Sequence, residues 1–153
     1  VLYPLHRDEK TPLLLSLLLG ERGKVLIFTR TKHRADRLAR AVGAAGHRVA
    51  RLHADRSQSE RRRALDGFRA GQYRVLVATD IAARGIDVVD ISHVINYDLP
   101  ATPEDYIHRI GRTARAEASG LASSFAAPEE GDQLRAIERH LGQPLRRERA
   151  RAR

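Results

Sequence analysis

The sequence contains no cysteine, no methionine and no tryptophan, and aromatic residues make up only 5% of its 153 residues. Without cysteine there can be no disulfide framework and no cysteine-ligated metal site. The run Leu13–Leu19 spans seven residues and is interrupted by Ser16, whereas a bilayer-spanning helix needs roughly 20 apolar residues. These absences exclude a disulfide-rich secreted domain and predict a protein that does not span a membrane.

Lysine is also scarce. The chain has 28 lysines and arginines, of which three are lysines, so 25 are arginines, and the formal net charge is +9. A GC-rich genome explains such an excess of arginine, and so does phosphate recognition, which suits the planar guanidinium group. The charge predicts an anionic partner. Because Val1 stands where an initiator methionine would, and no leader pattern follows, we expect a fragment of a longer cytoplasmic protein.

Helical and strand patterns alternate along the chain, which predicts an α/β domain with a mostly parallel sheet. The predicted strands are 25–28, 48–53, 74–78, 93–97 and 120–127. The predicted helices are 11–19 with Thr11 as N-cap, 32–45, 57–70 behind a Ser57–Glu60 capping box, 102–115 and 132–141. Polar residues follow several strands, at the edge where parallel sheets bind ligands.

Residues 146–153 hold five arginines. We expect a domain over residues 1–145, followed by a disordered basic tail. An RNA-binding extension is the alternative interpretation of that tail.

The most informative segment is 108–115, in which Arg109, Arg112 and Arg115 recur at every third residue behind His108. On a helix, His108, Arg112 and Arg115 share one stripe, and Arg109 lies beside it. Such a cluster of like charges repels itself unless a strongly anionic ligand, such as a nucleoside triphosphate, lies among the guanidinium groups.

A second dense segment, 77–87, follows a buried strand. Thr79 and nearby backbone N–H groups are suited to holding a phosphate, and Asp87 to accepting hydrogen bonds from ribose hydroxyls. Taken alone, the segment has a simpler interpretation, with Thr79 and Asp80 as helix caps and Gly85 as a turn residue.

Together the segments resemble the C-terminal RecA-like domain of DEAD-box RNA helicases. Four stretches carry the resemblance in chain order: 25–31 looks like motif IV, 58–61 like the Gln-x-x-Arg element, 78–87 like motif V, and 108–115 like motif VI. The pattern is most similar to the RhlE-like bacterial type. The resemblance implies a three-layer RecA-like domain in which helices flank a mostly parallel central sheet.

The resemblance also implies a role for each matching residue. The catalytic residues would be two arginine fingers that reach the γ-phosphate of ATP, Arg112 and Arg115. Contacts to ATP would come from Asp87, Arg84 and Gly85. Coupling between two helicase domains would come from His108 and Arg109. Contacts to RNA would come from Thr31, Gln58, Arg61, Thr79 and Gly85. Phe28 is expected in the core.

Three positions depart from the family pattern: Ala54 and Ala114 replace glycines, and Ala116-Glu117 stands where Ala-Gly is common. Alanine tolerates positive φ poorly, so Ala114 is expected to change the aim of Arg115 and makes Arg112 the firmer of the two fingers. Ala54 weakens the expectation that backbone N–H groups at that site contact RNA.

The chain contains neither a Gly-x-x-x-x-Gly-Lys-Ser/Thr phosphate loop nor an Asp-Glu-Ala-Asp segment. The resemblance places both on an N-terminal RecA-like domain of the same protein, which would also hold Mg²⁺. We therefore expect ATP as the cofactor, RNA and that domain as partners, a monomer, no metal held by this chain, and no ATP hydrolysis by this chain alone.

The function implied is that of one half of an ATP-dependent RNA helicase that unwinds short duplexes. Two alternatives stay open from the sequence. One is a stand-alone RNA-binding or protein-docking module, and the other is a DNA-acting superfamily 2 helicase domain, because the 2′-hydroxyl contacts that distinguish RNA from DNA leave no trace in the sequence.

Overall fold

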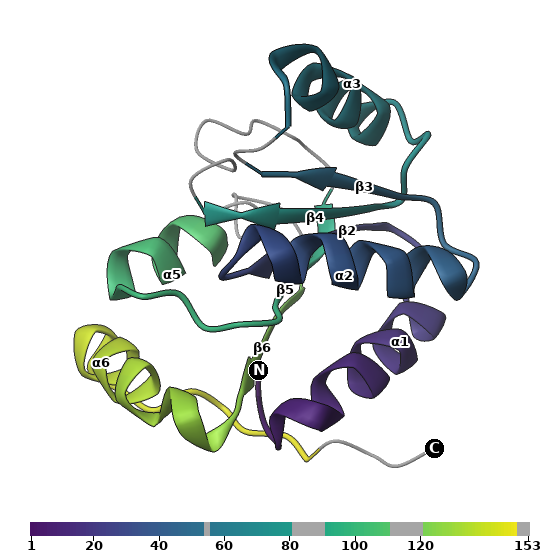
Figure 1. The fold of residues 1–153 in the computed structure, drawn as a ribbon. Coiled ribbons are helices and arrows are strands. Elements are labelled where there is room, and N and C mark those ends of the chain that lie inside the picture. The colour runs from purple at the N-terminus through teal and green to yellow at the C-terminus, as the bar shows by residue number, and fades with distance from the viewer. Residues whose placement is uncertain (54–55, 81–90, 111–120, 150–153) are drawn as a thin grey trace.

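The computed structural model describes residues 1–53, 56–80, 91–110 and 121–149. Its elements, in chain order, are β1 (Leu2–Pro4), η1 (Arg7–Glu9), α1 (Lys10–Gly20), β2 (Lys24–Thr29), α2 (Lys32–Ala44), β3 (Val49–Leu52), α3 (Gln58–Arg69), β4 (Val75–Thr79), β5 (Ile91–Asn96), α5 (Pro103–Ile110), β6 (Leu121–Ala126), η2 (Pro128–Glu130) and α6 (Gly131–Leu141). Six strands form one sheet in the order β1-β6-β5-β2-β4-β3, and every neighbouring pair is parallel (Figure 1).

Strands β2 and β4 are mostly apolar on both faces, as their sequences predict. Along β2, Val25 and Ile27 belong to one core cluster, whereas Leu26 and Phe28 belong to another on the opposite face. This alternation follows from the two-residue period of a strand. Helices therefore cover both faces of the sheet, and the predicted three-layer α/β arrangement is confirmed.

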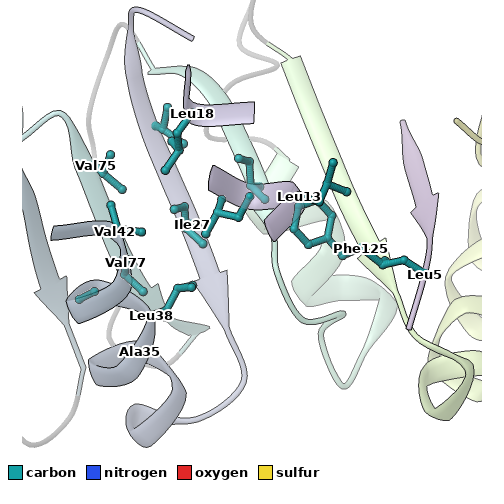
Figure 2. Close-up of a cluster of buried hydrophobic side chains, with 14 residues drawn as sticks. Leu5, Leu13, Leu18, Ile27, Ala35, Leu38, Val42, Val75, Val77 and Phe125 are labelled. Atoms are coloured by element: carbon teal, nitrogen blue, oxygen red, sulfur yellow. The ribbon is translucent and has the colours of Figure 1, made fainter. Parts of the chain in front are cut away.

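The first face is covered by α1 and α2. Leu13 and Leu18 of α1 and Leu38 of α2 pack against Ile27 of β2 and Phe125 of β6 (Figure 2). The ring of Phe125 also meets Tyr3 edge-on, with 6.0 Å between ring centroids. None of the helices in the described residues is long and apolar enough to cross a membrane.

The opposite face has two smaller clusters. Phe68 of α3 packs on the half of the sheet formed by β2, β3 and β4. Tyr106 of α5 and Ile137 of α6 pack with Leu2 and Ala126 on the other half. The sheet centre is thereby buried, and the carboxyl ends of β2, β4 and β5 lead into the segments that carry the predicted site residues.

The starts of α3 and α1 confirm one predicted helix cap and contradict another. The Ser57–Glu60 capping box is confirmed: Ser57 Oγ accepts a hydrogen bond from the Glu60 N–H (3.2 Å), and a Glu60 carboxylate oxygen accepts one from the Ser57 N–H (3.0 Å). The prediction of Thr11 as an N-cap is wrong, because α1 begins at Lys10 with Glu9 as its N-cap residue. The Thr11 hydroxyl instead shares a hydrogen bond with the Tyr97 hydroxyl (2.8 Å).

Strand β1 is missing from the sequence-based prediction, because three residues are too few to display a strand period. It pairs with β6 on one side, and Leu2 is hydrogen-bonded on the other side to the chain beyond α6. There the Leu2 N–H donates to the Arg146 carbonyl (2.7 Å), and the Glu148 N–H donates to the Leu2 carbonyl (2.8 Å). The start of the predicted basic tail thus covers a sheet edge. Residues 150–153 lie outside the described residues, so the disorder expected there stays a prediction.

Removing the α3 cap tests the local basis of this fold. Replacing Ser57 with alanine is expected to lower the free energy of unfolding by about 1 kcal/mol, because the Glu60 N–H loses its acceptor. Urea unfolding of Ser57→Ala and of the neighbouring Ser59→Ala measures the effect. The change at Ser59 removes no helix cap, and an equal loss in both variants would contradict the capping argument.

Candidate functional site

The carboxyl ends of three neighbouring strands bring the candidate site residues together. Phe28 of β2 is in register with Asn96 of β5, and Thr29 of β2 with Thr79 of β4. Since parallel strands end at one edge of the sheet, the segments after Thr29, Thr79 and Asn96 emerge side by side. Of the predicted residues, Arg84, Gly85, Asp87, Arg112 and Arg115 lie outside the described residues.

Arg109 of α5 is a buried charge at this edge. Its side chain is only 1% exposed, and its Nε and Nη2 atoms donate to the two carboxylate oxygens of Asp80 at 2.5 and 2.6 Å. Its Nη1 donates to the Asn96 side-chain oxygen (3.1 Å) and to the Asp98 carbonyl (2.7 Å). A bidentate guanidinium–carboxylate pair of this kind fixes the orientation of both groups.

The Phe28 ring completes this environment. The centre of the Arg109 guanidinium lies 4.8 Å from the ring centroid, a geometry in which the face of the ring attracts the cation. Phe28 itself is 2% exposed and packs in the α3-side core, so its predicted core position is confirmed. The Arg109 side chain is therefore held by β2, β4 and β5 at once.

The salt bridge joins the starting points of the two segments that sequence analysis singled out. Asp80 directly precedes residues 81–87, and Arg109 lies two residues before residues 111–115. The pair therefore fixes the residue before the first segment against the helix that precedes the second. Sequence reasoning considered Asp80 only as a cap and gave Asn96 no role, because neither residue type at a strand end signals a partner in α5.

The two residues predicted to couple domains differ in exposure. Arg109 is buried and donates hydrogen bonds to Asp80 and Asp98 of this domain, whereas His108, one residue earlier on α5, is exposed. The coupling role stays a prediction for both. Exposure favours His108 over Arg109 as a direct contact with another domain.

The residues predicted to bind RNA lie around the same edge. Thr31 is exposed and caps α2, where its hydroxyl accepts a hydrogen bond from the Arg34 N–H (3.2 Å). Gln58 is exposed and Arg61 half-buried in the first turn of α3, and Thr79 is 8% exposed at the end of β4. The structure thus distributes these residues along the ends of β2 and β4 and the start of α3, and their RNA contacts stay predictions.

A second charged cluster at this edge escaped the sequence analysis. Asp98 is 2% exposed and accepts hydrogen bonds from Lys10 Nζ (3.2 Å), Arg34 Nη1 (2.9 Å) and the Arg30 N–H (2.9 Å). Lys10, itself 4% exposed, also donates to Glu130 (2.6 Å). The cluster borders a cavity of about 430 Å³. The sequence around Lys10 does not indicate its role, because its partners are 88 and 120 residues away in the chain.

The cluster has an electrostatic consequence for Asp98. Burial by itself favours the neutral acid, but the Arg30 N–H and the charges of Lys10 and Arg34 outweigh it. The pKa of the Asp98 carboxyl therefore lies below its ordinary value of 3.8. The charged form stabilises the chain between β5 and α5, the stretch that leads to Arg109.

The Arg109–Asp80 pair can be tested by a double-mutant cycle. Arg109→Gln is expected to lower the free energy of unfolding by about 3 kcal/mol, because Asp80 keeps a charge in a partly buried site without its partner. Asp80→Asn in the Arg109→Gln background should restore part of that loss. Additive effects in urea unfolding would show that the two groups do not interact.

The Asp98 cluster makes a prediction for pH. Because the folded-state pKa of Asp98 lies below the unfolded one, its ionised form stabilises the fold above about pH 4, and this contribution is lost as the pH falls through the folded-state pKa. The difference in unfolding free energy between the native protein and Asp98→Asn should therefore shrink below about pH 4.

Unfolding of both proteins between neutral and acidic pH measures this difference. Asp66→Asn is a matched control, since the Asp66 side chain is 63% exposed. A difference for Asp98→Asn that stays constant across the pH range would contradict the assignment.

Comparison with known proteins gives the site its context. Residues 9–117 match the helicase conserved C-terminal domain. The chain is 47% identical over 142 residues to the ATP-dependent RNA helicase RhlB of Shewanella piezotolerans, covering 92% of this chain and 32% of RhlB. The chain therefore spans about a third of the length of that curated relative. RhlB is among the matches, and the finer assignment to the RhlE-like type stays a prediction.

Solved structures of DEAD-box proteins also resemble this chain. The Escherichia coli DEAD-box protein SrmB, bound to the regulator RraA, superposes with a TM-score of 0.88 at 37% identity, over 99% of this chain and 89% of that one. Saccharomyces cerevisiae Dbp5, bound to RNA and ADP BeF₃, superposes with a TM-score of 0.86 at 39% identity, over 97% of this chain and 40% of that one. With its all-parallel sheet and matched motifs, this chain belongs to the C-terminal RecA-like domains of the DEAD-box RNA helicases.

Proposed function

We propose that this chain is the C-terminal half of an ATP-dependent RNA helicase that closes with an N-terminal RecA-like domain around ATP and RNA. Family membership supports this proposal, as does the RNA-bound Dbp5 relative. Closure would bend one RNA strand and separate a short duplex, and ATP hydrolysis would reset the two domains.

The observation that carries the proposal is the salt bridge between buried Arg109 and partly buried Asp80. It joins Asp80, which precedes residues 81–87, to α5, which precedes residues 111–115. The first segment contains the proposed ribose contact Asp87, and the second contains the proposed arginine fingers Arg112 and Arg115. A composite ATP site requires both segments to meet the same nucleotide, and a rigid link between their starting points is suited to that task.

In this proposal Arg112 and Arg115 face the γ-phosphate, where charge accumulates on the transferring phosphoryl group. A guanidinium group placed there is worth roughly 10³- to 10⁵-fold in rate. Arg84 and Gly85 complete the nucleotide contacts on this side. The phosphate loop and the Mg²⁺ ligands belong to the N-terminal domain, since neither sequence element occurs in this chain. This chain alone is therefore expected not to hydrolyse ATP.

RNA would be held through its phosphate backbone, without reading of its sequence. Of the proposed contacts, Thr31 and Thr79 lie at the ends of neighbouring strands and Gln58 and Arg61 at the start of α3, whereas Gly85 lies outside the described residues. The net charge of +9 favours such contacts and predicts affinity that falls steeply with salt. A monomeric state and a cytoplasmic location stay predictions from the sequence.

Substituting a finger in the full-length protein tests the proposal. Arg112→Ala is expected to reduce RNA-stimulated ATP hydrolysis by about 10³-fold, with RNA affinity little changed, because only charge at the γ-phosphate is lost. Phosphate release and RNA titration are measured on the same preparation. Arg139→Ala, at an exposed position of α6, is the control.

The other outcomes identify the alternative functions. Weaker RNA binding with unchanged ATP hydrolysis in Arg112→Ala would contradict the proposal and favour a binding module. Stronger stimulation by DNA than by RNA of the same length would favour a DNA-acting helicase. RNA-stimulated phosphate release by the 153-residue chain alone would show that the proposed division of the ATP site between two domains is wrong.

A further inference from the structure

The two edges of the sheet differ in how the chain covers them. At the β1 edge, Leu2 exchanges backbone hydrogen bonds with Arg146 and Glu148 beyond α6 (2.7 and 2.8 Å). The opposite edge is β3, which pairs with β4 alone (Figure 1). Within the described part of the chain, no residue forms a ladder with the outer side of β3.

The register of β3 identifies the backbone groups that point outward. The Val75 N–H of β4 donates to the Arg48 carbonyl (3.1 Å), and Val49 is in register with Val75. In a parallel ladder alternate residues bond to the same neighbour, so Ala50 and Leu52 face β4. The N–H and C=O groups of Val49 and Arg51 therefore point away from the sheet, spaced as an added strand requires.

A groove follows this edge on the α3 side. It has a volume of about 270 Å³ and is bordered by β3, by Tyr73 and by Arg56, Glu60 and Arg63. Arg56 pairs with Glu60 through one terminal nitrogen (3.2 Å), and its buried Nε has no hydrogen-bond partner among the described residues.

The charges around the β3 edge indicate the charge of the segment that would bind there. Arg48 and Arg63 are exposed, and Arg51 and Arg56 are half-buried, whereas the acidic groups that pair with them among the described residues are Asp36 and Glu60. We propose that the outer edge of β3 binds an extended acidic peptide segment of a partner protein, which adds to the sheet as a strand beside β3. This inference goes beyond the proposed helicase function and does not depend on ATP.

The same observations argue against two other occupants. A second copy of this chain would bring Arg48 and Arg51 of its own β3 against the same arginines, and like charges across a ladder are destabilising. A nucleic acid would satisfy the arginines, but its backbone has no alternating N–H and C=O groups to pair with Val49 and Arg51. An acidic strand satisfies both the ladder and the charge.

The test uses an acetylated, amidated octapeptide that alternates glutamate with valine, added to the 153-residue chain. Amide hydrogen exchange is followed by NMR, residue by residue. Saturating peptide is expected to slow exchange of the outward Val49 and Arg51 amides by at least about tenfold, with little change at Ala50 and Leu52, which face β4 in the free protein. Backbone N-methylation of alternate peptide residues keeps the charge but removes donors, and should weaken binding at least about tenfold.

Variants of the protein test the same edge. Val49→Pro removes an outward N–H, which an edge strand tolerates, and should weaken binding about three- to tenfold, whereas Val49→Thr keeps the N–H and should bind like the native protein. Thermal unfolding confirms that each variant is folded. Arg63→Ala should weaken binding and reduce its salt dependence, since it removes a charge beside the groove.

Four outcomes would overturn the proposal: no protection of Val49 and Arg51, equal binding of the N-methylated peptide, the same protection by single-stranded RNA, or protection in the free protein that rises with its concentration. Equal binding of the N-methylated peptide would mean that charge alone attracts it. Protection by RNA would indicate a nucleic-acid surface. Protection that rises with protein concentration would indicate that a second copy pairs with the edge. None of these outcomes concerns ATP hydrolysis, so they do not test the helicase proposal.

Discussion

The salt bridge between Arg109 and Asp80 is the interaction on which the geometry of the candidate site depends. A guanidinium group that is 1% exposed requires its donors to be satisfied, and the carboxylate of Asp80, the Asn96 amide, the Asp98 carbonyl and the Phe28 ring together do so. These groups come from β2, β4, β5 and the segments after them. Burial of one arginine thus ties α5 to three strand ends.

A second constraint lies beside the first. Asp98 accepts bonds from Lys10 and Arg34 through its side chain, while its carbonyl accepts a bond from Arg109. Glu130 bonds both Lys10 and the Leu99 N–H (2.7 Å). The turn between β5 and α5 is therefore held from both sides by charged groups, above a mostly apolar core. Charge at the strand ends organises the site, and apolar packing supports it.

Much of the fold was predictable because its signals are local. The apolar strand 25–28, the helix after Lys32 and the Ser57–Glu60 capping box all lie within a few residues of their own determinants, and the structure has them in place. Strand β1 was not predictable, because it is too short to show a period and is stabilised by partners 121 residues or more away. The false N-cap at Thr11 has the same origin, since Lys10 is held by distant carboxylates.

The candidate site likewise has features with local determinants and features that depend on distant residues. The family, the arginine cluster and the residues that match each motif could be identified from the sequence, because each motif consists of particular side chains at particular spacings. The folded structure was needed to show that Arg109 is a buried anchor while its neighbour His108 is exposed, and that Asp80 is its partner. It was also needed to show that, in the described part of the chain, one sheet edge is covered and the other is not. Those properties depend on which strands lie side by side, and strand order is set by packing between residues far apart in the chain.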